Sequence, residues 1–299
     1  GFEAAERIQI CETIVSPDYI YVKPMPKITL DYFLPSEVYG DDAFTQAIEP
    51  PIPFSLGVRI KNSGHGIARE LSIESAQPKI VENEQGLLIG FAIMGSQVNG
   101  KRTTESLLAD FGDIVPNTSG TARWIMTCSL SGRFIKFEAD FSHSNELGGT
   151  VTSFIEAVET HFLIRDVLVD AVGRDRILDF LARDGDIYRV YESESMETEV
   201  IDQTQYSNLT YLTTENNRPS YHLTTSVNNG FLYIRLPDPY NGGKVIYSAV
   251  RGDGKIIKPE NIWLSKSRDG QDWDHFLNLF DVAGTGEYTI IFADPMVAP

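Results

Sequence analysis

The tripeptide Arg251-Gly252-Asp253 carries the best-known recognition chemistry of any short motif in this chain, the binding of integrins. Recognition of that kind needs a cation and a carboxylate held apart at an exposed loop tip. The same residues also suit a hairpin turn, because glycine tolerates the backbone that a tight turn requires. Strand-like runs at 245–250 and 255–258 flank them. We therefore interpret the tripeptide as a turn and keep integrin binding as the alternative.

Three aspartates close to one another could bind calcium, namely Asp269, Asp272 and Asp274. Calcium takes several oxygen ligands from a compact loop, and carboxylates are its preferred protein ligands. The spacing departs from the twelve-residue calcium loop, which places Asp at alternate positions and a Glu at the end. Solvated loop carboxylates are the alternative account, so calcium is the one cofactor that the sequence leaves open.

Trp273 lies in the polar stretch 268–275 and could offer an exposed ring on which a sugar stacks. An indole that fills a gap under a loop is the alternative. Trp124 stands inside an apolar run, and we expect it in the core.

No arrangement of residues along the chain predicts a catalytic centre. The histidines lack zinc-ligand spacing, and no Gly-x-Ser-x-Gly turn nominates a nucleophile. We therefore expect no enzyme activity and no tightly bound transition metal. The five histidines are His65, His143, His161, His222 and His275.

The charge balance excludes some partners. The chain has 25 basic and 42 acidic residues in 299, a net charge of −17, which repels nucleic-acid phosphates. No apolar run reaches the roughly 18 residues that a membrane helix needs.

The two cysteines, Cys11 and Cys128, could form one bridge or stay free.

Short runs with alternating apolar residues predict an all-β fold. In residues 54–60, every second side chain is apolar, and similar runs recur along the chain between turn residues. Only the segment 174–183 has helical spacing, at Ile177, Leu178 and Leu181.

We expect two tandem antiparallel β-sandwich domains joined by a short helical linker. The predicted boundaries are a leading arm at 1–26, an immunoglobulin-like sandwich at 27–164, the linker at 165–186 and a fibronectin III-like sandwich at 187–299.

The stretch Val58-Arg-Ile-Lys-Asn-Ser-Gly-His-Gly-Ile-Ala68 resembles the cell-adhesion-related domain of bacterial surface and secreted proteins. Residues 247–292 resemble the fibronectin type III-like module that accompanies such domains. The resemblance implies an extracellular or cell-surface location and carries over no functional residues.

From these observations we expect a non-catalytic structural or adhesive segment of a larger secreted protein, with a protein or glycan ligand. A carbohydrate-binding sandwich and an accessory region of a secreted hydrolase are the alternatives, because the fold alone does not separate them.

Overall fold

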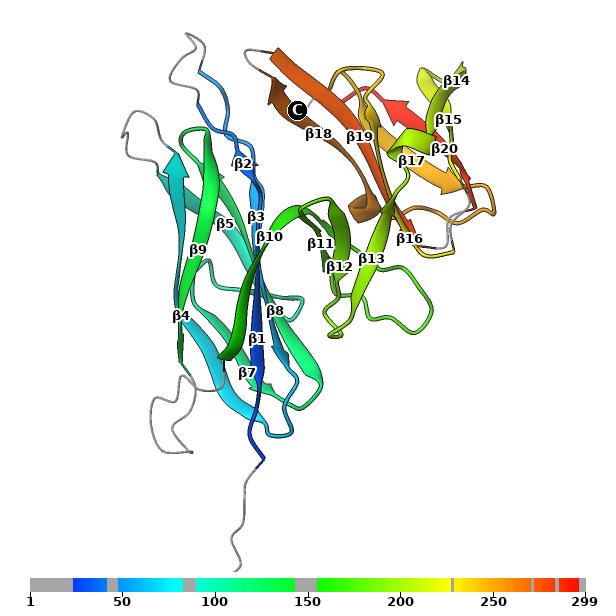
Figure 1. The fold of residues 1–299 in the computed structure, drawn as a ribbon. Coiled ribbons are helices and arrows are strands. Elements are labelled where there is room, and N and C mark those ends of the chain that lie inside the picture. The colour runs from blue at the N-terminus through cyan, green and yellow to red at the C-terminus, as the bar shows by residue number, and fades with distance from the viewer. Residues whose placement is uncertain are drawn as a thin grey trace, which may run out of the picture.

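The computed structural model describes residues 24–41, 48–82, 90–142, 155–226, 229–269, 272–282 and 285–295, with side chains except those of 74–82, 133–142 and 269. Most of the predicted leading arm, and Cys11 with it, lies outside this part. Every regular element in the described part is a β-strand or a short 3-10 helix, which confirms the all-β prediction (Figure 1). None of the described residues belongs to a helix long and apolar enough to cross a bilayer.

One sheet of twelve strands runs through the described chain. Its strands, in spatial order, are β18 (Ile262–Asp269), β19 (Asp272–Val282), β16 (Phe231–Pro237), β13 (Glu197–Asp202), β12 (Ile187–Tyr191), β11 (Asp179–Asp184), β10 (Ile155–Val167), β1 (Ile28–Leu34), β3 (Phe54–Asn62), β8 (Thr118–Cys128), β5 (Phe91–Val98) and β6 (Lys101–Thr103). The pairs β1/β10 and β13/β16 are parallel, unlike the antiparallel pairing that the sequence predicts.

Two four-stranded sheets lie at opposite ends of the molecule (Figure 1). The first contains β2 (Glu37–Val38), β9 (Gly132–Ser142), β4 (Ala68–Glu82) and β7 (Ala109–Ile114). The second contains β14 (Asn208–Glu215), β15 (Arg218–Thr224), β20 (Glu287–Ala293) and β17 (Val245–Arg251). The 3-10 helices are η3 (Thr204–Tyr206) and η4 (Pro259–Asn261).

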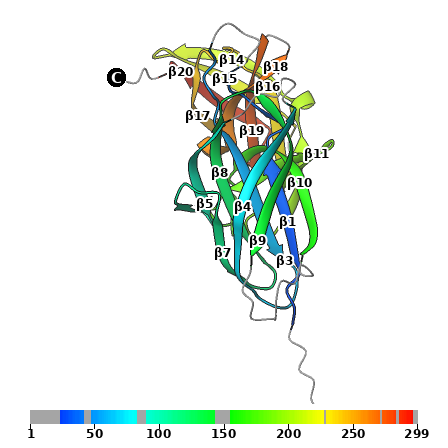
Figure 2. The ribbon, with the colours of Figure 1, turned by 90° about the vertical axis from the view of Figure 1, so that its left-hand side faces the viewer.

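The first core lies between one end of the large sheet and the sheet of β2, β9, β4 and β7, whose long strands run side by side in Figure 2. The alternating run 54–60 forms most of β3, and its Leu56, Val58 and Ile60 are fully buried. They share this core with Trp124, which is 1% exposed and so confirms its predicted place.

The other end of the large sheet contributes to two further cores. One joins β16, β18 and β19 to β15, β17 and β20, and includes Leu232, Leu279 and Ile290. The other contains Val167, Leu181 and Phe280.

β10 connects the two ends of the large sheet. The first end consists of β1, β3, β8, β5 and β6, and the second end consists of β11, β12, β13, β16, β19 and β18. Residues 155–162 of β10 pair with β1 in parallel, and its residues 162–167 pair with β11 in antiparallel. Beside this crossing point lies a small cluster of buried side chains, namely Phe33, Leu163, Phe180, Ala182 and Tyr191. The predicted linker 165–186 therefore contains the end of β10 and the whole of β11, both within the sheet.

The helix predicted at residues 174–183 is wrong. Residues 174–178 are irregular, and β11 begins at Asp179. Leu181 points into one core, and Phe180 and Ala182 point into the cluster on the other side. A strand covered on both faces has a continuous apolar run, which periodicity does not separate from a helix.

The turn residues Asn228-Asn-Gly230 favour a hairpin of residues 221–227 and 231–236, but this prediction is also wrong. β15 pairs with β14 and β20, whereas β16 pairs with β13 and β19 in the large sheet. The two strands therefore cross between layers, and Asn228 of the predicted turn lies outside the described residues.

Candidate functional site

A buried histidine lies where β1, β10, β11 and β12 meet. In the parallel register of β1 and β10, Asp31 is opposite Glu159 and Phe33 is opposite His161. Residues two apart on a strand share a face, so all four side chains lie on one side of the sheet. The His161 ring stacks on Phe33, with ring centroids 5.2 Å apart, and the Tyr191 ring centroid lies 4.4 Å from it.

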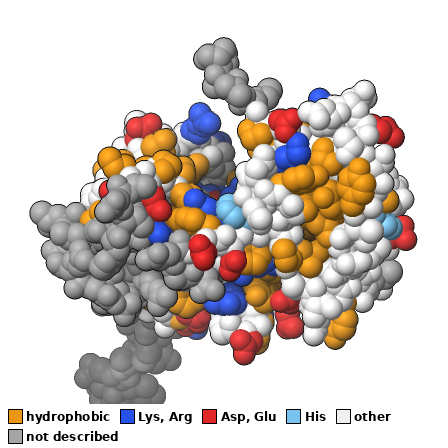
Figure 3. Space-filling view, turned by 90° about the horizontal axis from the view of Figure 1, so that it is seen from above, with side chains coloured by type: hydrophobic (Ala, Val, Ile, Leu, Met, Phe, Trp, Pro, Cys, Tyr) orange, Lys and Arg blue, Asp and Glu red, His pale blue; other side chains and the backbone are white. Residues whose placement is uncertain are grey.

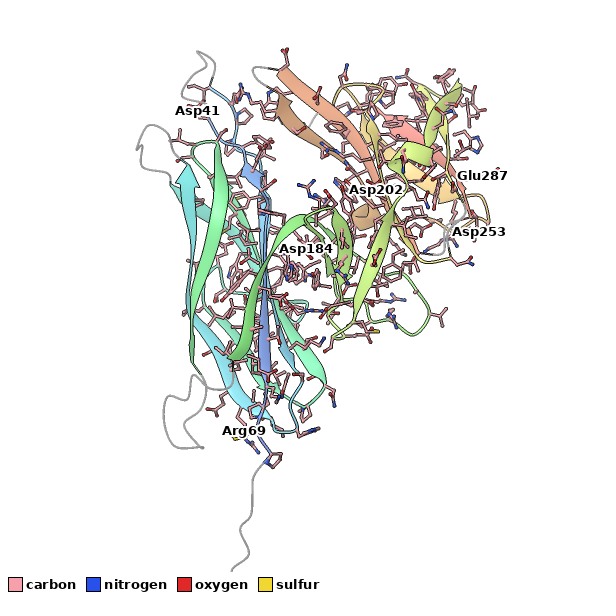
Figure 4. The ribbon with its side chains drawn as sticks, in the orientation of Figure 1. Asp41, Arg69, Asp184, Asp202, Asp253 and Glu287 are labelled. Carbon is pink, nitrogen blue, oxygen red and sulfur yellow. The ribbon has the colours of Figure 1, made fainter. Side chains whose placement is uncertain are left out.

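Carboxylates surround both ring nitrogens of His161. Its Nδ1 lies 2.7 Å from Asp184 Oδ1, and its Nε2 lies 3.4 Å from Asp31 Oδ1. The Tyr191 hydroxyl donates to Asp184 Oδ2 at 2.6 Å. Glu159 Oε2 is 4.0 Å from Nε2. Asp184 occupies the centre of the molecule, between its two ends (Figure 4).

Arg59 of β3 contacts both this cluster and β13. Its side chain is fully buried, and its guanidinium contacts Asp31 Oδ2 at 2.7 Å and Glu197 Oε1 at 2.6 Å. It also donates to the carbonyl of Met196 at 3.0 Å. A buried guanidinium without partners would be very unfavourable, so these contacts fix Arg59 between β1 and β13.

The protonation of the cluster follows from its contacts. Burial alone would lower the pKa of His161, but hydrogen bonds to Asp31 and Asp184 raise it above the usual value. Burial would likewise raise the pKa of Asp31, yet His161 and Arg59 hold it below the usual value. These contacts therefore favour the charged forms of both His161 and Asp31.

A second buried arginine lies on the same face of the sheet. Arg123 Nε is 2.8 Å from Asp166 Oδ1, and its guanidinium lies over the Phe180 ring. Ser55 donates to the same Asp166 carboxylate at 2.5 Å. A hydroxyl of β3 and a guanidinium of β8 thus share Asp166 of β10, and the guanidinium also contacts Phe180 of β11.

The Arg251-Gly252-Asp253 tripeptide forms a turn after β17. Gly254 N donates to Arg251 O at 2.8 Å, and Gly254 has φ +91°. The predicted second arm, 255–258, contributes only an isolated bridge between Val250 and Ile256.

The charges of this turn bind within the chain. The Arg251 side chain is 10% exposed and lies 2.7 Å from Asp253 Oδ2 and 3.0 Å from Asp281 Oδ2. The hydrogen bond from Arg251 lowers the pKa of Asp253 to about 2. The cation and the carboxylate are therefore paired rather than held apart. Asp253 lies near Glu287 at the edge of the molecule (Figure 4).

Trp273 is partly buried in the β18/β19 hairpin. Lys266 Nζ lies 3.8 Å from the centroid of its ring, and the edge of Tyr39 packs against it. These contacts fit an indole that packs under neighbouring side chains.

The three aspartates of the calcium prediction lie at the end of that hairpin. Asp272 and Asp274 are exposed, and the side chain of Asp269 lies outside the described residues. The calcium site thus stays a prediction.

No model of a known protein family matches the chain, and no curated protein matches its sequence. Geometry is therefore the basis for any functional argument.

The sequence patterns missed the cluster around His161, because Asp31 of β1 stands 130 residues before His161 of β10 in the chain. One signal was present. Asp31 and Arg59 each stand between two apolar residues of a strand, and a charge in such a position is paired when both faces of the strand are buried.

Proposed function

We propose that this chain is a non-catalytic structural or adhesive segment of a larger secreted or cell-surface protein, and that it holds two tandem β-sandwich domains in a fixed orientation. The observation that carries the proposal is β10, which pairs with β1 on one side and with β11 on the other. Two domains that share a strand within one sheet do not rotate independently, because rotation would break the ladder hydrogen bonds.

Buried polar contacts between the two ends support the same proposal. Arg59 reaches Glu197 and the backbone at Met196, and Ser119 donates to the carbonyl of Ser193 at 2.5 Å. Each contact loses its partner if the ends separate, and an unpaired buried charge costs several kcal/mol. Such contacts favour one relative orientation.

The expected partner is a protein or a glycan. A net charge of −17 disfavours nucleic acid, and Figure 3 shows acidic side chains scattered among basic and hydrophobic ones on the face seen from above. The resemblance of residues 58–68 to cell-adhesion-related domains supports the extracellular setting. The internal pairing of Arg251 speaks against adhesion through the tripeptide.

The distance between spin labels on the two ends tests the fixed orientation. Labels at Ile125→Cys of β8 and Leu212→Cys of β14 occupy exposed positions, in a chain that also carries Cys11→Ser and Cys128→Ala. We expect one narrow distance distribution in pulsed electron resonance.

The control pair is Ile67→Cys with Ile125→Cys, because both sites belong to the first end. Its width reports the motion of the labels alone. A distribution between the ends that is much broader than this control, or that has several maxima, would contradict the proposal.

A further inference from the structure

Three potential metal ligands converge on the solvent side of the His161 cluster. Asp31 Oδ1, Glu159 Oε2 and His161 Nε2 all lie within 4.8 Å of one another. The register of β1 and β10 fixes this set, because it places Asp31 opposite Glu159 and His161 two residues further along the same face. Two carboxylate oxygens with one imidazole nitrogen form a donor set that zinc-type ions accept.

Neighbouring groups orient two of these ligands. Asp184 contacts His161 Nδ1 at 2.7 Å, and Tyr191 donates to the other oxygen of Asp184. A carboxylate on the second nitrogen is the arrangement that fixes a metal-binding histidine. Arg59 contacts Oδ2 of Asp31, so that Oδ1 faces Nε2.

The spacing at Nε2 is also wide enough for an ion. A charged N–H donor and a carboxylate normally approach to about 2.7–2.9 Å, and Nδ1 does so with Asp184. Nε2 instead lies 3.4 Å from Asp31 Oδ1. Two ligands on a tetrahedral zinc, with bonds of roughly 2.0–2.1 Å, lie about 3.3 Å apart.

Of the three potential ligands, Glu159 is the one that an ion can reach from solvent. Its side chain is 60% exposed, whereas those of Asp31 and His161 are 4% and 5% exposed. Its oxygen is 4.0 Å from Nε2, and a flexible, exposed side chain can close that distance around an ion. A fourth position remains for water.

The charges of the cluster also leave room for a divalent cation. Four carboxylates oppose two cationic arginine and lysine side chains in the cluster, so the fixed charges do not repel a divalent cation. The carboxylates are those of Asp31, Glu159, Asp184 and Glu197, and the cations are Arg59 and Lys61.

We propose that Asp31, Glu159 and His161 bind one divalent transition-metal ion of the zinc type. The ion joins β1 to β10 and, through Asp184, reinforces the contact with β11. The proposal departs from the sequence, which predicts no such site because Asp31 and His161 stand 130 residues apart. It does not rest on the proposed function.

Calorimetric titration of the full chain, first freed of metal with EDTA, tests the site with ZnCl2 as the probe. We expect one ion per chain. Glu159→Gln should weaken the affinity at least tenfold without unfolding the chain, because the side chain is exposed. The matched control is Glu156→Gln, an exposed glutamate of the same strand that pairs with Lys27, and it should bind as the original chain does.

The visible absorption of bound cobalt is a second, independent measurement on the same site. Co²⁺ in place of Zn²⁺ should show the visible absorption of a four-coordinate ion, and Glu159→Gln should change that spectrum while Glu156→Gln does not. Equal zinc affinity in both variants would place the ion elsewhere on this acidic chain and overturn the proposal. The absence of a saturable site in the original chain would overturn it as well.

Discussion

Gly57 of β3 lies against the ring of Phe180. A Cβ atom at this position would overlap that ring. The ring is held in place, because it stacks on Phe33 with centroids 4.2 Å apart and lies 4.2 Å from the Arg123 guanidinium. Gly57→Ala should therefore lower the free energy of unfolding by about 1–3 kcal/mol through overpacking.

Gly95→Ala on β5 is the matched control for urea denaturation. A Cβ atom there meets nothing within 4 Å, so we expect a change of at most about 0.5 kcal/mol. If both variants lost the same stability, the loss at Gly57 would reflect the strand backbone and not its contact with Phe180.

Asp179, the first residue of β11, should make stability depend on pH. Burial raises the pKa of its carboxyl from 3.8 to about 7, although backbone N–H groups of Ser193 and Val169 donate to it. Between these two values the folded chain keeps a proton that the unfolded chain has lost. Stability should therefore fall as pH rises from about 4 to 7, by up to about 1.4 kcal/mol per pH unit, and this contribution is constant above pH 7.

Comparison with Asp179→Asn isolates this effect. Asp31 and Glu197 have lowered pKa values and act in the opposite direction, but they are present in both proteins and cancel in the difference. The stability of Asp179→Asn relative to the original chain should rise between about pH 4 and 7 and then stay constant. A difference that does not change with pH, or that falls, would show that Asp179 is ionised in the folded chain.

At the scale of the element, strands in which apolar and other residues alternate could be predicted well. Residues 54–60 fall within β3, and residues 121–130, where apolar residues also alternate, overlap β8, although both strands are buried on both faces in their middle. The prediction failed where apolar residues follow one another without alternation. In β11 the run Phe180-Leu181-Ala182 is buried throughout, and no alternation remains to distinguish it from a helix.

Pairing between strands could not be predicted from turn residues alone. β18 and β19 pair along their length, whereas β15 and β16 follow each other in the chain and belong to different sheets. The His161 cluster depends on the parallel contact of β1 with β10, which no local pattern encodes. The residues of the cluster could therefore not be predicted from the sequence. The charged residues Asp31 and Arg59 indicated only which two strands carry a buried charge.

At the scale of the molecule, contacts between the two ends are distributed over several places. β10 pairs with β11, and the Phe180 ring packs on Phe33. Arg268 of β18 contacts Glu49 at 3.0 Å, far from the His161 cluster. The connection from β10 to β11 runs through residues 168–178, where Val172 is fully exposed. Arg123 of β8 donates to the carbonyl of Leu178 near the end of this connection, so its contact with the first end lies beyond the exposed Val172.

Cutting that connection should therefore leave the molecule in one piece. A specific protease site inserted between Val172 and Gly173 places the cut where a Cβ on the glycine would meet nothing within 4 Å. After cleavage we expect two bands on a denaturing gel and one particle, at the elution volume of the uncut insertion variant, in size-exclusion chromatography. The β10–β11 ladder, the packing of Phe180 on Phe33 and the contact of the buried Arg59 with the partly exposed Glu197 hold the fragments. The ladder and the ring packing do not depend on exposed charges, so moderate salt should not separate the fragments. Two separate peaks under native conditions would mean that residues 168–178 act as a simple linker between independent domains, and the shared strand would then contribute little to the orientation of the two ends.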